Sequence, residues 1–404
     1  MKRLLKRLNL ATAAALWLLA APSEASGGGR AEADSLRAAV DSAFRPLVRE
    51  HDIPGLAVAV TVDGEEYHFS YGLASREAGV PVSKETIFEL GSISKVFTAT
   101  LAAFAEASGK LSWSDHPGRF VPELRGSPLD RATLLHLGTY TAGGLPLQFP
   151  QEVAGRESML RYFRNFAPDS GPGARRTYSN PSLGLFGHVA ALALGGDFAT
   201  LMERTLFREL GLRRTYVVVP DQAMSGYAWG YNAANRPVRV NPGVLASEAY
   251  GVKSTAADMI RFVELNIRPR GLSGPFEKAV RTTQVARFRV GPMIQGLGWE
   301  QYPYPLPLNR LLAGNSTEII MKSNPAAPVP GKGAGGACTL FNKTGSTNGF
   351  GAYVAFVPER RTGIVILANR NFPIPARVRA AHSLLERIGR ESSGKPCAPA
   401  DGGD

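Results

Sequence analysis

The segment SISKVFTATLAAFAEASGKL (92–111) joins a reactive side-chain pair to a helix. Apolar residues follow Lys95 at three- and four-residue spacing and stop at Gly109, which predicts an amphipathic helix. Ser92 and Lys95 form an S-x-x-K pair at the start of this helix, so their hydroxyl and amine lie one turn apart on one face. A buried lysine there can lose its proton and help to remove that of Ser92. Free backbone N–H groups at the helix start can stabilise a developing oxyanion.

Strands are predicted on both sides of this helix. GLAVAVTV (55–62) and EEYHFSYG (65–72) are rich in β-formers, and Asp63-Gly64 between them is the dipeptide of a tight hairpin. The C-terminal part contains four further strand-like runs: GLGWEQY (296–302), CTLFNKTGS (338–346), FGAYVAFVPE (350–359) and TGIVILANR (362–370). The middle of the chain reads mainly as helices joined by Pro- and Gly-rich loops.

We therefore expect an α/β (α+β) architecture in which both ends of the chain build one antiparallel sheet flanked by helices. The middle would form a separate all-α domain, and the cleft between the two parts is a favoured place for a ligand site. The predicted division is a signal peptide at 1–25, an α/β domain from 26–88 and 291–390, a mainly helical domain at 89–290, and a flexible polar tail at 391–404.

The N-terminus has the pattern of a secretory signal. Four basic residues lie within 2–7, and an apolar stretch at 10–21, too short to span a bilayer, precedes small residues around Ala25. Removing residues 1–25 takes away four positive charges and Glu24, which lowers the net charge from +12 to +9. We expect an exported, periplasmic protein with no membrane anchoring after cleavage.

Composition narrows the class of protein further. Hydrophobic residues make up 44% of the 404 residues and charged residues 20%, an ordinary globular balance. The basic residues are scattered in pairs such as Arg175-Arg176 rather than clustered, so we expect no nucleic-acid partner. The two cysteines, Cys338 and Cys397, could pair in an oxidising compartment or remain free thiols, and both readings stay open. The six histidines form no H-x-H or H-E-x-x-H pattern, so we expect no metal and no cofactor.

Two further motifs follow the S-x-x-K pair along the chain. Tyr178-Ser179-Asn180 is the single Y-x-N, and a tyrosine can act as acid or base if nearby lysine ammonium groups lower its pKa. Lys343-Thr344-Gly345 lies on a predicted inner strand, where it can present an ammonium and a hydroxyl to a substrate carboxylate. Each motif by itself has an ordinary structural explanation. S-x-x-K and K-T-G together are typical of serine β-lactamases and penicillin-binding proteins.

With Y-x-N as the middle motif, the chain resembles the class C, AmpC-type serine β-lactamases. The resemblance extends over residues 35 to 390 and includes blocks such as LLHLGTYTAGGLPLQFP (134–150) and NKTGSTNGFGAYVAFVPE (342–359). It implies the serine β-lactamase/penicillin-binding-protein fold, an active site in the cleft between its domains, and a small-molecule β-lactam as substrate. No further interaction segment is visible, so we expect a monomer.

The resemblance also implies residue roles. Ser92 would be the acylated nucleophile with Lys95 as its activating partner, and Tyr178 would share proton transfer in acylation and deacylation. The backbone N–H groups of Ser92 and Ser346 would form the oxyanion hole. The expected substrate contacts are the amide-binding Gln148 and Asn180, the carboxylate-binding Lys343, Thr344 and Asn369, and Tyr250 in the side-chain pocket.

Three functions fit this apparatus. The first is a periplasmic cephalosporinase, which would confer resistance to β-lactam antibiotics. The second is a D-Ala-D-Ala carboxypeptidase or esterase of the same Ser-Lys-Tyr family, although the intact K-T-G motif and Gln148 favour the lactamase. The third is a penicillin sensor that acylates without turnover, against which the presence of Tyr178 argues. The chain contains no G-x-S-x-G motif, so an α/β-hydrolase type of serine enzyme is excluded.

Overall fold

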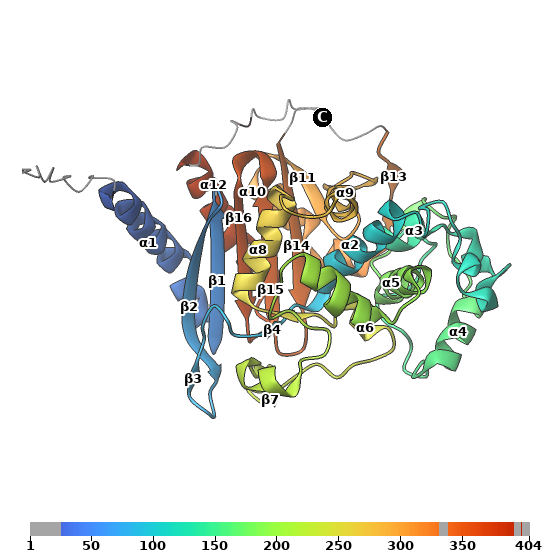
Figure 1. Cartoon of the computed structure of the whole chain (residues 1–404), viewed down its shortest axis with the longest axis horizontal. Helices are drawn as coiled ribbons and strands as arrows, with labels where there is room; N and C mark the ends of the chain where they lie inside the picture. Colours follow the sequence, from blue (N-terminus) through green and yellow to red (C-terminus); the bar gives the residue numbers. More distant parts are fainter. Residues whose placement is uncertain (1–25, 331–337, 392–396, 398–404) are drawn as a thin grey trace, which may run out of the picture.

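A ten-stranded antiparallel sheet forms the centre of the computed structural model, which describes residues 26–330, 338–391 and 397 (Figure 1). The predicted signal peptide and nearly all of the predicted tail lie outside the described residues. The strand order is β13-β9-β10-β11-β14-β15-β16-β1-β2-β3. The strands are β1 (Gly55–Val62), β2 (Glu65–Ser75), β3 (Val80–Pro81), β9 (Phe288–Val290), β10 (Met293–Gln295), β11 (Glu300–Tyr304), β13 (Ala327–Pro328), β14 (Cys338–Ser346), β15 (Gly351–Val357) and β16 (Thr362–Ala368).

Both ends of the chain contribute to this sheet, as the sequence predicted. β1 pairs with β16 in a register that sets Leu56 opposite Ala368. The β1–β2 hairpin turns at Asp63 (φ 57°) and Gly64 (φ 96°), and two successive positive φ values are what a two-residue type I′ turn requires. Every residue of β1 is buried, since the strand lies inside the sheet with helices on both faces.

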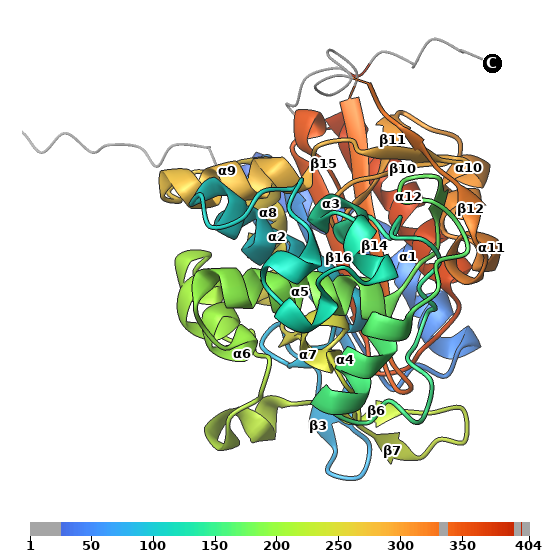
Figure 2. The same ribbon diagram turned by 90° about the vertical axis from the view of Figure 1, so that its right-hand side faces the viewer.

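The helices cover the two faces of the sheet (Figures 1 and 2). On one face, α1 and α12 pack on side chains such as Val58 and Ile366; on the other, α8 packs on neighbours such as Ala57 and Leu367. Alternate strand residues thus serve two separate cores. The helices are α1 (Ser26–Glu50), α2 (Ser94–Ala107), α3 (Leu134–Gly138), α4 (Arg156–Asn165), α5 (Asn180–Leu194), α6 (Phe198–Leu201), α7 (Ala246–Ala249), α8 (Ala256–Ile267), α9 (Gly274–Thr283), α10 (Leu308–Gly314), α11 (Thr317–Met321) and α12 (Ile374–Glu391).

Helix α2 joins the sheet to the helical part of the molecule. Its Phe97 packs in the core beneath α8, whereas its Ala102 packs in a third core with α3, α4 and α5. Helix α8 lies within the segment predicted as the helical domain, yet it packs on the sheet. The predicted boundary at residue 291 falls in the turn between β9 and β10.

Three short strand pairs outside the ten-stranded sheet connect loops of the described residues. They are β12 (Asn324–Pro325) with β5 (Arg175–Arg176), β4 (Phe88–Glu89) with β8 (Lys253–Ser254), and β6 (Gly230–Tyr231) with β7 (Pro237–Val238). Within the described ranges, no single helix is long and apolar enough to cross a membrane. Helix α5 and residues 198–207 are together long and apolar enough to cross a membrane, but this pair is bent by 75°.

Cys338 and Cys397 form a disulfide, with their Cα atoms 5.6 Å apart. The bond settles the question that the sequence left open and ties residue 397 to the first residue of β14. Cys338 is buried beside Tyr304 and Leu340 in the core that α12 covers.

Reducing this disulfide is expected to lower the free energy of unfolding by at most about 4 kcal/mol, because the bond closes a loop in the unfolded chain. The two cysteines are separated by 59 positions. Urea unfolding with and without dithiothreitol measures the effect. A variant carrying Cys338→Ser and Cys397→Ser is the control, since its unfolding should not respond to the reductant. Identical wild-type curves after complete reduction would contradict the prediction.

Candidate active site

The S-x-x-K segment lies where a short 3-10 turn leads into α2. The turn covers Gly91–Ile93, and Ser92 is its partly exposed central residue. Gly91 has φ +52°, and a Cβ built on it would come 2.5 Å from the backbone nitrogen of Ser346. A Cβ on Gly345 would come 2.0 Å from the carbonyl oxygen of Leu90. The Gly91–Ile93 turn and the end of β14 therefore lie close together along their backbones, which only glycine at both positions permits.

Lys95 is fully buried one turn after Ser92. Its Nζ donates to Ser92 Oγ at 3.0 Å, to Asn180 Oδ1 at 2.6 Å and to the carbonyl oxygen of Ala249 at 2.8 Å. These three acceptors use the three donors of an ammonium group. Burial lowers the pKa of Lys95 to about 8, so the amine can lose its proton close to neutral pH.

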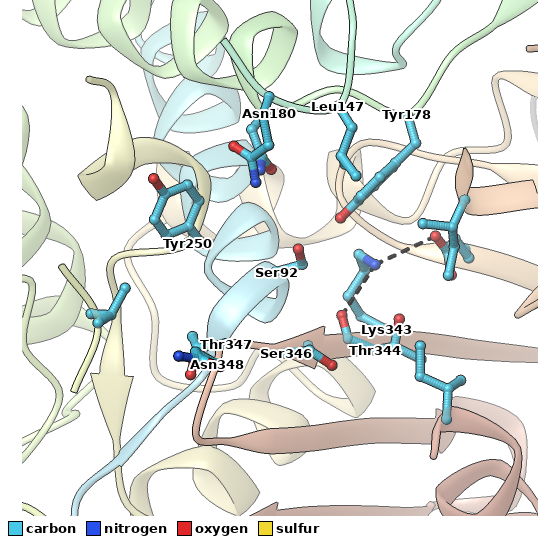
Figure 3. A pocket seen from close by; sticks show the side chains of 16 residues that line it. Ser92, Leu147, Tyr178, Asn180, Tyr250, Lys343, Thr344, Ser346, Thr347 and Asn348 are labelled. Atoms are coloured by element: carbon cyan, nitrogen blue, oxygen red, sulfur yellow. Dashed lines mark hydrogen bonds and ion pairs between the residues drawn. The ribbon is translucent and has the colours of Figure 1, made fainter. Parts of the chain in front are cut away.

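Tyr178 lies directly opposite, just before α5. Ser179 caps that helix by accepting a hydrogen bond from the Ser182 N–H at 3.0 Å, which fixes the backbone next to the tyrosine. Figure 3 shows the Tyr178 hydroxyl pointing toward Ser92 and Lys343. Burial by itself would raise the pKa of Tyr178, but the positive charges of Lys343 and Lys95 outweigh it and bring this pKa down to about 8.

Lys343 belongs to β14 and contacts Glu300 of the neighbouring β11. Its Nζ lies 3.5 Å from Glu300 Oε1 and donates to the carbonyl oxygen of Thr344 at 3.2 Å. Burial would lower the pKa of Lys343, but the charges of Glu300 and Tyr178 raise it above its ordinary value. Lys343 therefore stays positively charged when Lys95 has lost its proton, and it can attract an anionic substrate group.

Arg176 and Glu300 are site residues that sequence reasoning missed. The Arg176 guanidinium is fully buried, lies 3.5 Å from Glu300 Oε1 and stacks 5.2 Å from the ring centroids of Tyr140 and Tyr178. It also donates to Gln295 Oε1 at 2.9 Å. The sequence contained only weak indications of these two residues. Glu300 is a charged residue within the strand-like run GLGWEQY (296–302), and Arg176 ends an arginine pair two residues before Tyr178.

A cavity of about 350 Å³ lies between the end of β14 and the start of α5 (Figure 3). Eight of the ten predicted site residues line it: Ser92, Gln148, Tyr178, Asn180, Tyr250, Lys343, Thr344 and Ser346. Lys95 lies buried behind Ser92. The lining also includes residues that were not predicted: Leu147, Val240, Glu300, Ile320, Thr347, Asn348 and Ile374. Across the described ranges, no three His, Cys, Asp or Glu side chains are grouped to hold a metal ion.

Asn369 is the one predicted site residue that the structure places elsewhere. It is fully buried behind the end of β16, where its Oδ1 accepts from the Gly55 N–H at 2.6 Å. Its Nδ2 donates to the carbonyl oxygens of Leu73 and Trp229, both at 3.0 Å. These partners satisfy the amide within the protein, and Asn369 does not line the cavity. Ile374, five residues later, reaches the cavity from the same segment.

The lowered pKa of Tyr178 gives a prediction that needs no substrate. Among twelve tyrosines, one is expected to ionise with a midpoint near pH 8, and the ultraviolet absorption of tyrosinate reports it. Tyr178→Phe should remove this titration. Glu300→Gln should move it to lower pH, because Glu300 is an anion that raises the pKa of Tyr178. If no tyrosine ionised below the ordinary value of 10.0, the electrostatic account of Tyr178 would be wrong.

The comparisons with known proteins agree with this geometry. The family model described as Beta-lactamase matches residues 40–387. A β-lactamase of Pseudomonas fluorescens is 49% identical over 356 residues, which cover 88% of this chain and 99% of the relative.

Solved structures place the chain more finely. A class C β-lactamase in complex with cefoxitin superposes with a TM-score of 0.85 at 41% identity, covering 88% of this chain and 99% of the other. A structure described as a β-lactamase/D-alanine carboxypeptidase from Pseudomonas syringae gives a TM-score of 0.85 at 46% identity, with 87% and 99% covered. The chain therefore belongs to the β-lactamase family, in its class C, AmpC-type branch of serine hydrolases that act on a cyclic amide bond.

Proposed function

We propose that this protein is a cephalosporinase that opens the β-lactam ring through an acyl-enzyme on Ser92. The observation that carries the proposal is the contact of Lys95 Nζ with Ser92 Oγ at 3.0 Å, at the wall of a cavity that also exposes Tyr178 and Lys343. A nucleophile in contact with a buried amine of lowered pKa is the arrangement that serine activation requires.

Acylation begins with attack of Ser92 Oγ on the lactam carbonyl carbon. The pair of Lys95 and Tyr178 accepts the hydroxyl proton, because each can lose its own proton near pH 8. The backbone N–H groups of Ser92 and Ser346 donate to the oxygen of the tetrahedral intermediate. Collapse breaks the lactam C–N bond, and Tyr178 returns a proton to the leaving nitrogen.

Deacylation uses the same groups in reverse. Tyr178 faces Ser92, so it can take a proton from a water molecule that attacks the ester carbonyl. Lys343 and Lys95 favour the tyrosinate form that this step needs, since both positive charges lower the pKa of Tyr178. The C–O bond of the ester breaks, Tyr178 passes the water's proton to Ser92 Oγ, and the drug is released with its ring opened by one water molecule.

Substrate recognition is divided between the two walls of the cavity. Lys343 and Thr344 on β14 would hold the carboxylate of the drug. Asn180 would bind the amide side chain with its Nδ2, because its Oδ1 already accepts from Lys95. Gln148 is exposed at the cavity mouth and would contact the same amide, while Tyr250 would line the pocket of the acyl substituent.

D-Ala-D-Ala carboxypeptidase activity is the second candidate. It would use the same acylation of Ser92, and the related Pseudomonas syringae structure is described by both activities. The release of D-alanine from a peptide ending in D-Ala-D-Ala, measured beside cephalosporin hydrolysis, decides between the two. A catalytic efficiency that is higher for the peptide would contradict the cephalosporinase proposal.

The proposed cellular setting is the periplasm, reached through the signal at 1–25, with the mature chain acting as a monomer that confers β-lactam resistance. Expression in a susceptible bacterium tests this setting. The full chain should raise the inhibitory concentration of a cephalosporin and fractionate with the periplasm. A chain starting at Ser26 should stay in the cytoplasm and give no protection.

Ser92→Ala should abolish hydrolysis of a chromogenic cephalosporin, lowering kcat by at least about 10³-fold, because the nucleophile is lost. Its urea unfolding should match wild type, since Ser92 is partly exposed and the substitution removes only a hydroxyl at the cavity wall. Retained turnover would mean that another residue is the nucleophile.

Lys343→Ala should lower kcat/KM for a cephalosporin by roughly 10- to 100-fold, since charged hydrogen bonds contribute about 1.5–3 kcal/mol. The loss should be smaller for the same drug with its carboxylate esterified. Lys278→Ala is the control, because that exposed lysine pairs with Glu106 away from the cavity lining. Equal losses for the free acid and the ester would show that Lys343 does not bind the carboxylate.

A further inference from the structure

Glu89 is a buried carboxylate that the mechanism above does not use. It ends β4 three residues before Ser92 and is 2% exposed. Its Oε1 accepts from Tyr227 OH and from the Val240 N–H, both at 2.7 Å, and its Oε2 accepts from Thr347 Oγ1 at 2.6 Å. One side chain therefore joins three segments that are far apart in the sequence.

Two of these segments form the wall of the cavity. Thr347 and Val240 both line it, and Thr347 directly follows Ser346, whose backbone N–H is a proposed oxyanion donor. The turn that contains Thr347 closes when the Thr347 N–H donates to the carbonyl oxygen of Phe350 at 3.0 Å. The position of this turn therefore sets where the Ser346 N–H points.

The bond from Glu89 to Thr347 adds to the contacts between the Gly91–Ile93 turn and the end of β14. Gly91 touches the backbone of Ser346, and Gly345 touches the carbonyl oxygen of Leu90, as described above. These contacts limit how closely the two segments approach, but van der Waals contact by itself fixes no direction. A hydrogen bond to a carboxylate is directional and about twice as strong as a neutral one.

Arg377 holds the residue before Ser346, since its Nη1 donates to the carbonyl oxygen of Gly345 at 2.8 Å. The residue after Ser346 is held by Glu89. The donor N–H thus lies between two charged anchors that come from different parts of the chain.

We propose that Glu89 is a positioning residue for the oxyanion hole, which it fixes by holding Thr347 against the segment that leads to Ser92. This inference rests on the proposed acylation of Ser92. Glu89 touches neither the substrate nor the reacting atoms. It acts through the direction of the Ser346 N–H, so its effect appears in the transition state rather than in ground-state binding.

Thr347→Val tests this inference, because it removes one hydroxyl and keeps the shape of the side chain. We expect kcat/KM for a chromogenic cephalosporin to fall by at least about tenfold, mainly in kcat. The affinity for an arylboronic acid, which forms a tetrahedral adduct with an active-site serine, should fall by a similar factor. Thr347→Ser keeps the hydroxyl and should restore both quantities.

Thr61→Val is the matched control. Thr61 on β1 is fully buried, and its hydroxyl also donates to a glutamate, Glu264 of α8. β1 is separated from β14 by β15 and β16, so this pair is remote from the cavity. The control should lose stability in urea as Thr347→Val does, yet keep the wild-type kcat/KM and boronic acid affinity.

Unchanged kcat/KM and boronic acid affinity in Thr347→Val would overturn the inference, and so would equal losses in Thr61→Val. Glu89→Ala also leaves a cavity in the core, so Thr347→Val is the decisive variant. If wild type did not hydrolyse the cephalosporin, the proposed function would fail. The boronic acid affinities would still decide the role of Glu89, since they need no turnover.

Discussion

The ring of Tyr178 is surrounded by three buried cations, Lys95, Lys343 and Arg176. Because these three positive charges are removed from water, the fold must compensate them with nearby acceptors. Burying an ion without partners costs several kcal/mol, so each cation has specific acceptors. Lys95 is surrounded by oxygen atoms from three elements, while Glu300 contacts both other cations. The charge that remains uncompensated acts on Tyr178, and it is the reason why a buried phenol can ionise near neutral pH.

This cluster can form only where the two halves of the molecule meet. Lys343 and Glu300 come from adjacent strands of the sheet, whereas Tyr178 comes from the helical part. Helix α2 packs against both halves and presents Lys95 at their junction. The sheet and the helices thus serve the same purpose, which is to bring cations from separate segments within about 5 Å of one phenol.

The sequence predicted the parts of this arrangement that depend on local pattern. The hairpin at Asp63-Gly64 follows from turn chemistry, and short motifs pointed to Ser92 and Tyr178, which both line the cavity. Arg176 and Glu300 escaped prediction, because a charged residue in a strand or loop is usually solvated and only the tertiary fold shows that these two face each other. Glu89 escaped for the same reason: its three partners lie more than 130 positions away along the chain.

Asn369 shows a different limit of sequence reasoning. A motif indicates that a segment reaches the site, but which side chain of that segment faces the cavity depends on how β16 ends and α12 begins. The amide of Asn369 turns toward backbone groups near β1, and Ile374 takes the place at the cavity. For a related reason, the sequence could not predict whether Cys338 and Cys397 pair. No local sequence pattern indicates that residue 397 approaches β14.

In the proposed mechanism, the cation cluster makes Ser92 a nucleophile whose ester is formed and then released. Rapid-quench mass spectrometry of the protein mixed with a cephalosporin tests this proposal. We expect a transient increase in mass on the peptide that contains Ser92, which decays as the hydrolysed drug appears. An adduct on another residue, turnover without any adduct, or an adduct on Ser92 that never decays would contradict it.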